Sequence, residues 1–466
     1  MNSLTSRQRK IVYALAILVL LVPIIYLGAP LSTDVQPGRK TAVTGGYLAK
    51  MRHEHELGES TLGDIDPSSA AANLVLLGLR GMAASVLHQN AIGYQERKDW
   101  GKLKSTVETI LRLQPHYVEV WKFQGWNLAF NVSREWDRVD DRFYWVKEGL
   151  KFLQKGSQRN QTATILFHNV GDFVGRKIGN SDEKKFFRRF FVADPDEEQF
   201  DGGADPGINE EGLDNYLVSR DWFLRANERD DVYPVKGITR EVFRRSPGQA
   251  MFDYANAISD EGKFDLTQKA WKDASDYWNN VFGNEIFYGL DDITYKYNSS
   301  PEEIEEMARQ NGVTVDVQRN TLVRRTKMIN YTFWQSVSAC EQDPNTVAAR
   351  KAIFAGKKAY GDGDISDRID ENGELQISTA QALFEDGIAR MQKMFVLHPV
   401  TSGHDDKILD AMLAIAYWQD IHKSNGKKLD PADPLTEFAN RFVRSHRRYQ
   451  GEVSKRFQQE NRFADF

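Results

Sequence analysis

The chain has 466 residues, of which 41% are hydrophobic and 27% are charged, a composition typical of a folded protein with room for several structural units. Its formal net charge of -5 provides no overall basic field, which argues against a nucleic-acid-binding protein that neutralises phosphates. The single cysteine, Cys340, excludes an intramolecular disulfide, a CxxC redox pair and every metal or haem motif that needs several cysteines.

The first feature along the chain is an uncharged apolar stretch, residues 11–31, preceded by a short basic segment, residues 1–10. About 20 apolar residues at roughly 1.5 Å each are enough to cross a bilayer, so we predict a transmembrane helix. A proline directly follows the small Gly–Ala pair near its end, which is a poor context for cleavage, and we interpret the stretch as a retained anchor. The positive-inside rule then places the N-terminus in the cytoplasm and the C-terminal body outside it, as in a periplasmic protein held at the inner membrane.

Helical patterning dominates the chain after a polar segment without sustained periodicity, and the fold class predicted is all-α. Strand-like alternation is confined to residues 311–325 and 367–377, where Asn372–Gly373 suits a tight hairpin turn. We interpret both as insertions. The predicted organisation is a cytoplasmic tail (1–10), an anchor (11–31), a spacer (32–69), a first set of helical repeats (70–200), an acidic insertion with a helix (201–247), and further repeats and irregular helical hairpins (248–466).

The helical part contains a recurring pattern of large, small and aromatic residues, in which Pro115 and Pro195 close the first and third units. Leu87 and Trp121, for example, are 34 residues apart and occupy the same place in successive units. Further units begin at Thr164 and Gly248, and the second-helix spacing returns from Gly387 to Pro399 without a clean first helix. The residues assigned to repeat positions are Leu87, Ala91, Tyr94, Pro115, Trp121, Gly125, Phe167, Gly171 and Pro195.

This pattern resembles the tetratricopeptide repeat family, here in a membrane-anchored bacterial-type member. The resemblance implies a solenoid of stacked helical hairpins with a concave groove. We expect Gly125 to let neighbouring helices approach closely and Trp121 to fill the space between hairpins. Carried over position by position, the family's groove residues fall here on His88, Gln95, Glu119, Lys122, Trp126, His168, Asp172, Phe252 and Asn256.

No residue constellation predicts a metal site or a cofactor. His53 and His55 lie in the polar spacer and match no HExxH spacing. The acidic segments 192–216 and 360–375 are interpreted as solvated loops, with calcium binding by a less regular loop as the alternative. Segment 360–375 does not match an EF-hand, because Arg368 stands where the first acidic ligand would have to be. Recognisable nucleophile, phosphate-binding and haem-attachment motifs do not occur, and an enzyme is therefore not predicted.

The function expected from the sequence is a membrane-anchored scaffold or adaptor that binds a protein or peptide partner in an envelope assembly. Trp126 and Lys122 are the residues expected to anchor that partner. A second hypothesis is an α-helical enzyme or binding protein that acts on an envelope polymer such as a polysaccharide. The two hypotheses differ in geometry, because the enzyme requires two or more carboxylates converging in a deep aromatic pocket.

Overall fold

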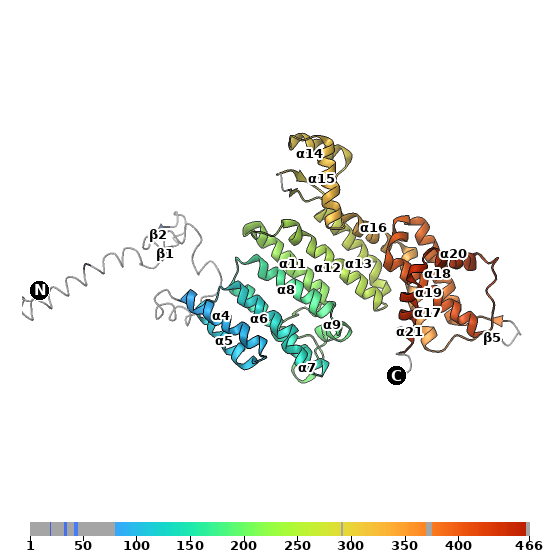
Figure 1. The fold of residues 1–466 in the computed structure, drawn as a ribbon, viewed down its shortest axis with the longest axis horizontal. Coiled ribbons are helices and arrows are strands. Elements are labelled where there is room, and N and C mark those ends of the chain that lie inside the picture. Colours follow the sequence, from blue (N-terminus) through green and yellow to red (C-terminus); the bar gives the residue numbers. More distant parts are fainter. Residues whose placement is uncertain are drawn as a thin grey trace, which may run out of the picture. The chain divides into compact units, whose positions relative to one another are not determined.

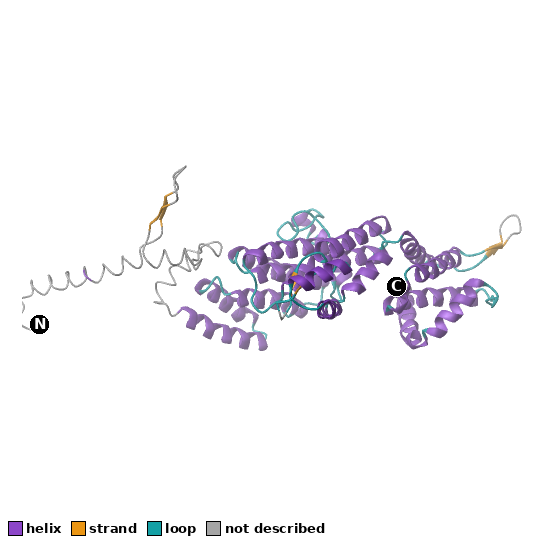
Figure 2. Ribbon diagram, turned by 90° about the horizontal axis from the view of Figure 1, so that it is seen from above, coloured by secondary structure: helices purple, strands orange, loops and turns teal. Residues whose placement is uncertain are grey.

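The computed structural model describes residues 19, 32–34, 42–44, 80–289, 292–369 and 375–462. Helices make up most of these ranges (Figure 2), and the all-α class is confirmed. The predicted anchor, residues 11–31, lies outside the described residues except for Val19. Among the helices that the structure describes, none is both long and apolar enough to cross a membrane.

Three short antiparallel strand pairs occur in the described ranges. One pair lies in the predicted spacer, and another joins the ends of the hairpin predicted around Asn372–Gly373, whose turn residues lie outside the description. The pairs are β1 (Ser32–Asp34) with β2 (Ala42–Thr44), β3 (Phe287–Tyr288) with β4 (Thr294–Tyr295), and β5 (Arg368–Ile369) with β6 (Leu375–Gln376).

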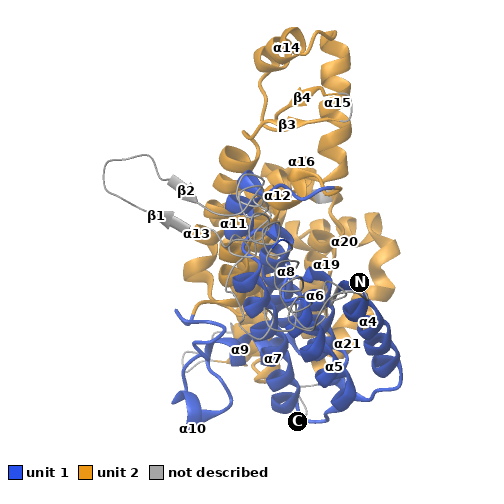
Figure 3. Ribbon diagram, turned by 90° about the vertical axis from the view of Figure 1, so that its left-hand side faces the viewer, with its two compact units in different colours: residues 1–212, 225–236 blue, residues 213–224, 237–466 orange. Residues whose placement is uncertain are grey.

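The chain divides into two compact units (Figure 3). Unit 1 comprises Met1–Gly212 and Arg225–Lys236, and unit 2 comprises Leu213–Leu224 and Gly237–Phe466. The helices up to α11 are, in chain order, α4 (Arg80–Glu96), α5 (Trp100–Leu113), α6 (Val118–Phe130), the 3-10 turn η2 (Val132–Glu135), α7 (Val139–Arg159), α8 (Thr164–Phe173) with its π-helical continuation η3 (Val174–Ile178), α9 (Lys184–Val192), α10 (Glu197–Phe200) and α11 (Asn215–Val232).

Unit 2 continues with a second series of helices, in which neighbours in the chain again pack together (Figure 1). They are α12 (Arg240–Asp260), α13 (Phe264–Asp276) with the π-helical η4 (Tyr277–Phe282), α14 (Pro301–Gln310), α15 (Val315–Met328), α16 (Tyr331–Glu341), α17 (Pro344–Gly361), α18 (Thr379–Leu397), η5 (Pro399–Gly403), α19 (Asp405–Ser424), α20 (Pro434–Ser445), η6 (Arg447–Tyr449) and α21 (Gln450–Arg462).

The closest helix contact in unit 1 is built on glycines, between α6 and α7. A Cβ atom added to Gly149 would lie 2.6 Å from the carbonyl oxygen of Gly125, and one added to Gly125 would lie 2.4 Å from Cγ of Leu153. Gly156 similarly faces the Trp121 ring, which is 1% exposed and donates its indole N–H to the Pro115 carbonyl at 2.7 Å. Gly125 thus has its expected role in close helix packing, whereas these contacts of Trp121 lie within the α6–α7 hairpin, and Trp121 also belongs to a buried cluster with Leu103 and Val107 of α5.

Two predictions about unit 2 are wrong. Residues 311–325 were expected to contain strand, but α15 occupies most of the segment, because the Thr314 hydroxyl accepts a hydrogen bond from the Val317 amide and caps a helix. The valines whose alternation suggested a strand lie around this cap. The second-helix spacing that ends at Pro399 was also expected to lack a clean first helix. In the structure, the helix with this spacing, α18, pairs with α17, and a Cβ on Gly387 would lie 2.6 Å from Cγ1 of Ile353.

The acidic segment after α9 is not simply solvated, contrary to the interpretation from sequence. Asp194 and Asp205 are each 3% exposed, and they surround the Lys147 amine of α7 at 2.6 and 3.6 Å. Lys151 pairs with Asp205 at 2.8 Å. Because buried carboxylates need partners, these two lysines hold the acidic segment against α7 and satisfy its charges.

Asp253, on α12, gives unit 2 a testable dependence on pH. Burial raises the pKa of Asp253 from 3.8 to about 6, opposed by one hydrogen bond from Gln249 at 3.3 Å. The folded state therefore holds the proton more tightly than the unfolded chain does. This contribution to stability is fully present below the unfolded pKa of 3.8 and is lost as the pH rises through about 6.

We expect Asp253→Asn to be more stable than the parent chain near neutral pH, by on the order of 2 kcal/mol, because the amide carries no buried charge. The difference in stability between the two chains should shrink as the pH is lowered to 3.8, the pKa of Asp253 in the unfolded chain. Chemical unfolding of both chains across this range measures it. A difference that stays constant with pH would contradict the prediction.

Candidate functional site

The candidate site is an open hollow of about 380 Å³ in unit 1, which we call the α4–α6 hollow. One lining residue comes from α4, six come from α6, and the last directly follows α6. Four of the predicted groove residues are among them. The lining residues are Gln95, Glu119, Lys122, Phe123, Trp126, Asn127, Phe130 and Asn131.

Aromatic rings form the apolar part of the α4–α6 hollow. Trp126 stacks on Phe130, with ring centres 4.5 Å apart and planes 18° apart. Both rings contact Phe173 of α8 edge-on, at 5.8 and 6.3 Å. Trp126 is therefore held by a rigid aromatic cluster while it lines an open surface. The exposed Trp136 contacts a different ring, that of Trp145.

Charged and amide groups surround these rings. Lys122 donates to both carboxylate oxygens of Glu119 at 3.0 Å, one helical turn apart. Asn131 donates to Oδ1 of Asn127 at 2.9 Å. Asn127 is 2% exposed, and its Nδ2 has no hydrogen-bond partner among the described residues. The hollow therefore combines an apolar floor, an ion pair and a donor that the fold leaves unused.

The remaining predicted groove residues do not line this hollow. His88 lies behind it, between the rings of Tyr117 and Phe123, at 5.5 and 5.8 Å. On α8, His168 is partly buried. Burial there raises the pKa of Asp172, and the ion pair with Arg176 at 2.7 Å opposes this shift.

In unit 2, the two groove residues predicted in the repeat unit that begins at Gly248 lie in different environments. Phe252 is fully buried and stacks on Trp334 at 4.7 Å, so it belongs to the core and not to a groove surface. Asn256 is exposed on the same helix. Neither residue is among those that line the α4–α6 hollow.

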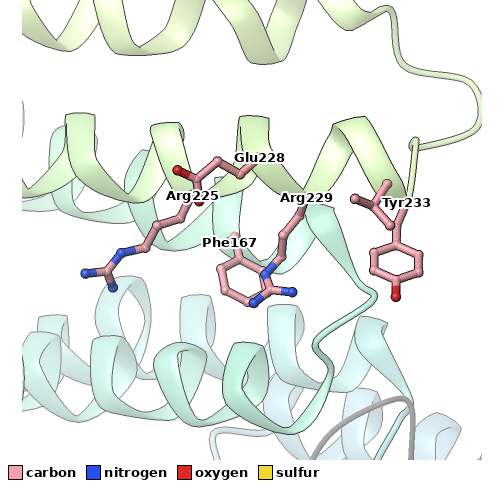
Figure 4. A pocket seen from close by; sticks show the side chains of 6 residues that line it. Phe167, Arg225, Glu228, Arg229 and Tyr233 are labelled. Carbon is pink, nitrogen blue, oxygen red and sulfur yellow. The ribbon is translucent and has the colours of Figure 1, made fainter. Parts of the chain in front are cut away.

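A second hollow in unit 1, of about 240 Å³, lies against α11 (Figure 4). Its lining residues are Phe167, Arg225, Glu228, Arg229, Val232 and Tyr233. Arg229 donates to the Gln161 carbonyl at 2.8 Å, and its guanidinium carbon lies 4.3 Å from the centre of the Phe167 ring. The packing of Phe167 between helices, expected from its repeat position, thus includes an arginine from α11.

Four residues of the α4–α6 hollow were missed in the sequence, and helical periodicity could have indicated them. Phe123, Asn127, Phe130 and Asn131 follow Glu119 at spacings of four, eight, eleven and twelve residues, which place them on one face of a helix. The family pattern restricts the groove to fewer positions. On α6 the groove face is wider than this pattern implies.

Comparison with known proteins adds no identification. The chain matches no model of a known protein family, and the search of curated proteins returns no match. The functional argument therefore rests on the residues of the site.

Proposed function

We propose that this protein is an adaptor of the tetratricopeptide-like class, anchored to the inner membrane by residues 11–31, with its helical body on the extracytoplasmic side. Its partner is a protein that inserts an extended segment into the α4–α6 hollow. The observation that carries the proposal is the meeting of Gln95, Glu119, Lys122 and Trp126 around one open aromatic hollow.

The chemistry of the hollow suits a peptide with an apolar side chain. Trp126 and Phe130 offer a preformed apolar surface whose orientation is held by Phe173. Peptide carbonyl groups are hydrogen-bond acceptors, and the exposed Asn131 provides an amide donor in the lining. Rigid aromatic anchors next to a charged group commonly carry most of the binding free energy at such interfaces.

The enzymatic form of the alternative, an enzyme acting on an envelope polymer, is less well supported by the same hollows. Each of the two contains one carboxylate, Glu119 in one and Glu228 in the other. Both oxygens of Glu119 already accept hydrogen bonds from Lys122. An acid–base pair that cleaves a glycosidic bond needs two carboxylates on either side of the bond. We therefore retain the adaptor as the proposed function.

Photo-crosslinking in membranes tests the proposal directly. A photoreactive side chain at Gln95 should form discrete adducts with a protein partner, whereas the same group at Tyr144, which is 52% exposed outside the hollow, should not. The Trp126→Ala and Lys122→Glu variants should each lower the yield of adduct about tenfold or more, as expected for a hot-spot residue.

Lys98→Glu is the matched control for the charge reversal, because Lys98 is exposed and pairs with Glu135 instead of a residue of the hollow. Its adducts should equal those of the parent chain. Equal adducts in all variants would show that the α4–α6 hollow is not the partner site. Adducts with polysaccharide in place of protein would favour the alternative function.

A further inference from the structure

The outer face of α9 carries an unusual surface in unit 1. The helix reads KKFFRRFFV and buries Phe187 and Phe191 completely. Its opposite face leaves Phe186 47% exposed, together with the exposed cations Lys184, Lys185 and Arg189. We call Lys184, Lys185, Phe186 and Arg189 the α9 face.

Among the described residues, the cations of the α9 face have no carboxylate partner, unlike several other lysines of unit 1. Lys98, Lys122, Lys147 and Lys151 each pair with a carboxylate within 3.0 Å. In the described part of the chain, by contrast, Lys184, Lys185 and Arg189 form no ion pair. Their positive charge therefore remains available to an anionic partner.

Aromatic side chains lie beside these cations. The guanidinium of Arg189 lies 5.8 Å from the ring centre of Phe186 and 5.4 Å from that of Phe190. Trp136, which is 42% exposed, lies near the start of α9, because Arg142 donates to both the Trp136 carbonyl and the Glu183 carboxylate at 2.7 and 2.8 Å. The exposed Phe186 ring thus lies beside an unpaired cation, and the backbone of Trp136 lies near the start of the same helix.

We propose that the α9 face docks onto an anionic lipid surface. Lysine and arginine are attracted to acidic headgroups, while exposed Phe and Trp rings are stable at the boundary between headgroups and acyl chains. An acidic protein segment would neutralise the cations but would not by itself account for the exposed Phe186 and Trp136. This surface shares no residue with the α4–α6 hollow, so the inference goes beyond the proposed adaptor function.

A fluorophore at position 186 tests the docking in the full-length chain. Cys340 is 0% exposed, so Phe186→Cys supplies the one accessible thiol among the described residues, and the parent chain checks for labelling of Cys340. The labelled chain is added to vesicles of phosphatidylcholine that carry a lipid-borne quencher, with or without phosphatidylglycerol. We expect strong quenching with phosphatidylglycerol, and weak quenching in neutral vesicles or at high salt.

Lys184→Ala, Lys185→Ala and Arg189→Ala, each introduced in the labelled chain, should lower the ratio of docked to undocked label about fivefold per cation. The matched control is the triple variant Arg441→Ala/Arg444→Ala/Arg447→Ala on and after α20, which removes three exposed arginines and should leave quenching unchanged. A label at Val317→Cys, in unit 2, should remain unquenched.

Three results would overturn the proposal. One is equal quenching in neutral and anionic vesicles, which would indicate binding without charge. Another is quenching that persists when all three α9 cations are removed. The third is a change in the fluorescence of the label when polyglutamate is added but not when anionic vesicles are added, which would identify an acidic protein as the partner. Circular dichroism of each variant verifies that the helices are intact.

Discussion

Replacing Trp121 with alanine is expected to destabilise the protein by about 3–5 kcal/mol, as found when large aromatic side chains are removed from protein cores. The ring is 1% exposed and packs against Gly156 of α7 and against Phe152, at 4.7 Å between ring centres. Its N–H also donates to the Pro115 carbonyl at 2.7 Å. The substitution therefore leaves a cavity, and it removes the shorter of the two hydrogen bonds that the Pro115 carbonyl accepts, the other coming from Asn160 at 3.4 Å.

Denaturant unfolding combined with hydrogen exchange measures this effect and locates it. Because the chain has two units, a single global transition is not assumed, and exchange of the α6 and α7 amides reports on unit 1. Trp136→Ala is the control, since Trp136 is 42% exposed and should cost less than about 1 kcal/mol. Equal losses in the two variants would contradict the assigned role of Trp121.

The second large effect is expected at Glu341, the buried anion of unit 2. Glu341 is 1% exposed and accepts hydrogen bonds from Nε and Nη2 of Arg350 at 2.6 and 2.7 Å. The amine of Lys407, also buried, contacts the same carboxylate. Glu341→Ala would leave the buried Lys407 amine without this partner and the partly buried Arg350 with only Asp410, at 3.4 Å, which should cost about 3–5 kcal/mol.

Thermal and denaturant unfolding of Glu341→Ala should therefore show a large loss of stability in unit 2. Glu452→Ala, which removes an exposed partner of Arg456, should change stability by less than about 1 kcal/mol. Burial lowers the pKa of Lys407, so part of the loss should be recovered as the pH rises and this amine becomes neutral in the variant. A loss no greater than that of Glu452→Ala would show that the buried cluster is not important for stability.

Local sequence patterns could predict helix starts, because a helix start depends on residues that lie close to it in the sequence. Thr164 begins α8 as the repeat pattern indicates, and proline and glycine mark the turns. The strand predicted in 311–325 was wrong because alternating valines satisfied a period of two. The capping of α15 by Thr314 outweighed that weak signal.

The candidate site could be predicted only in part, for a physical reason. Trp126 and Phe252 were assigned to the same kind of groove position, yet one lines a hollow and the other stacks on Trp334 in the core. Periodicity identifies the face of a helix on which a residue lies. It does not identify which neighbouring element covers that face.

The sequence by itself determined the all-α class, the close-packed glycine at Gly125 and the cluster of anchor candidates around Trp126, since each depends on spacing within one or two helices. Tertiary structure decided that Lys147 neutralises the distant Asp194 and Asp205, that α17 covers Gly387, and that Asn127 keeps an unused donor beside the aromatic rings. These outcomes depend on contacts between elements far apart in the chain. Burial and hydrogen-bond satisfaction exist only once those elements have packed together.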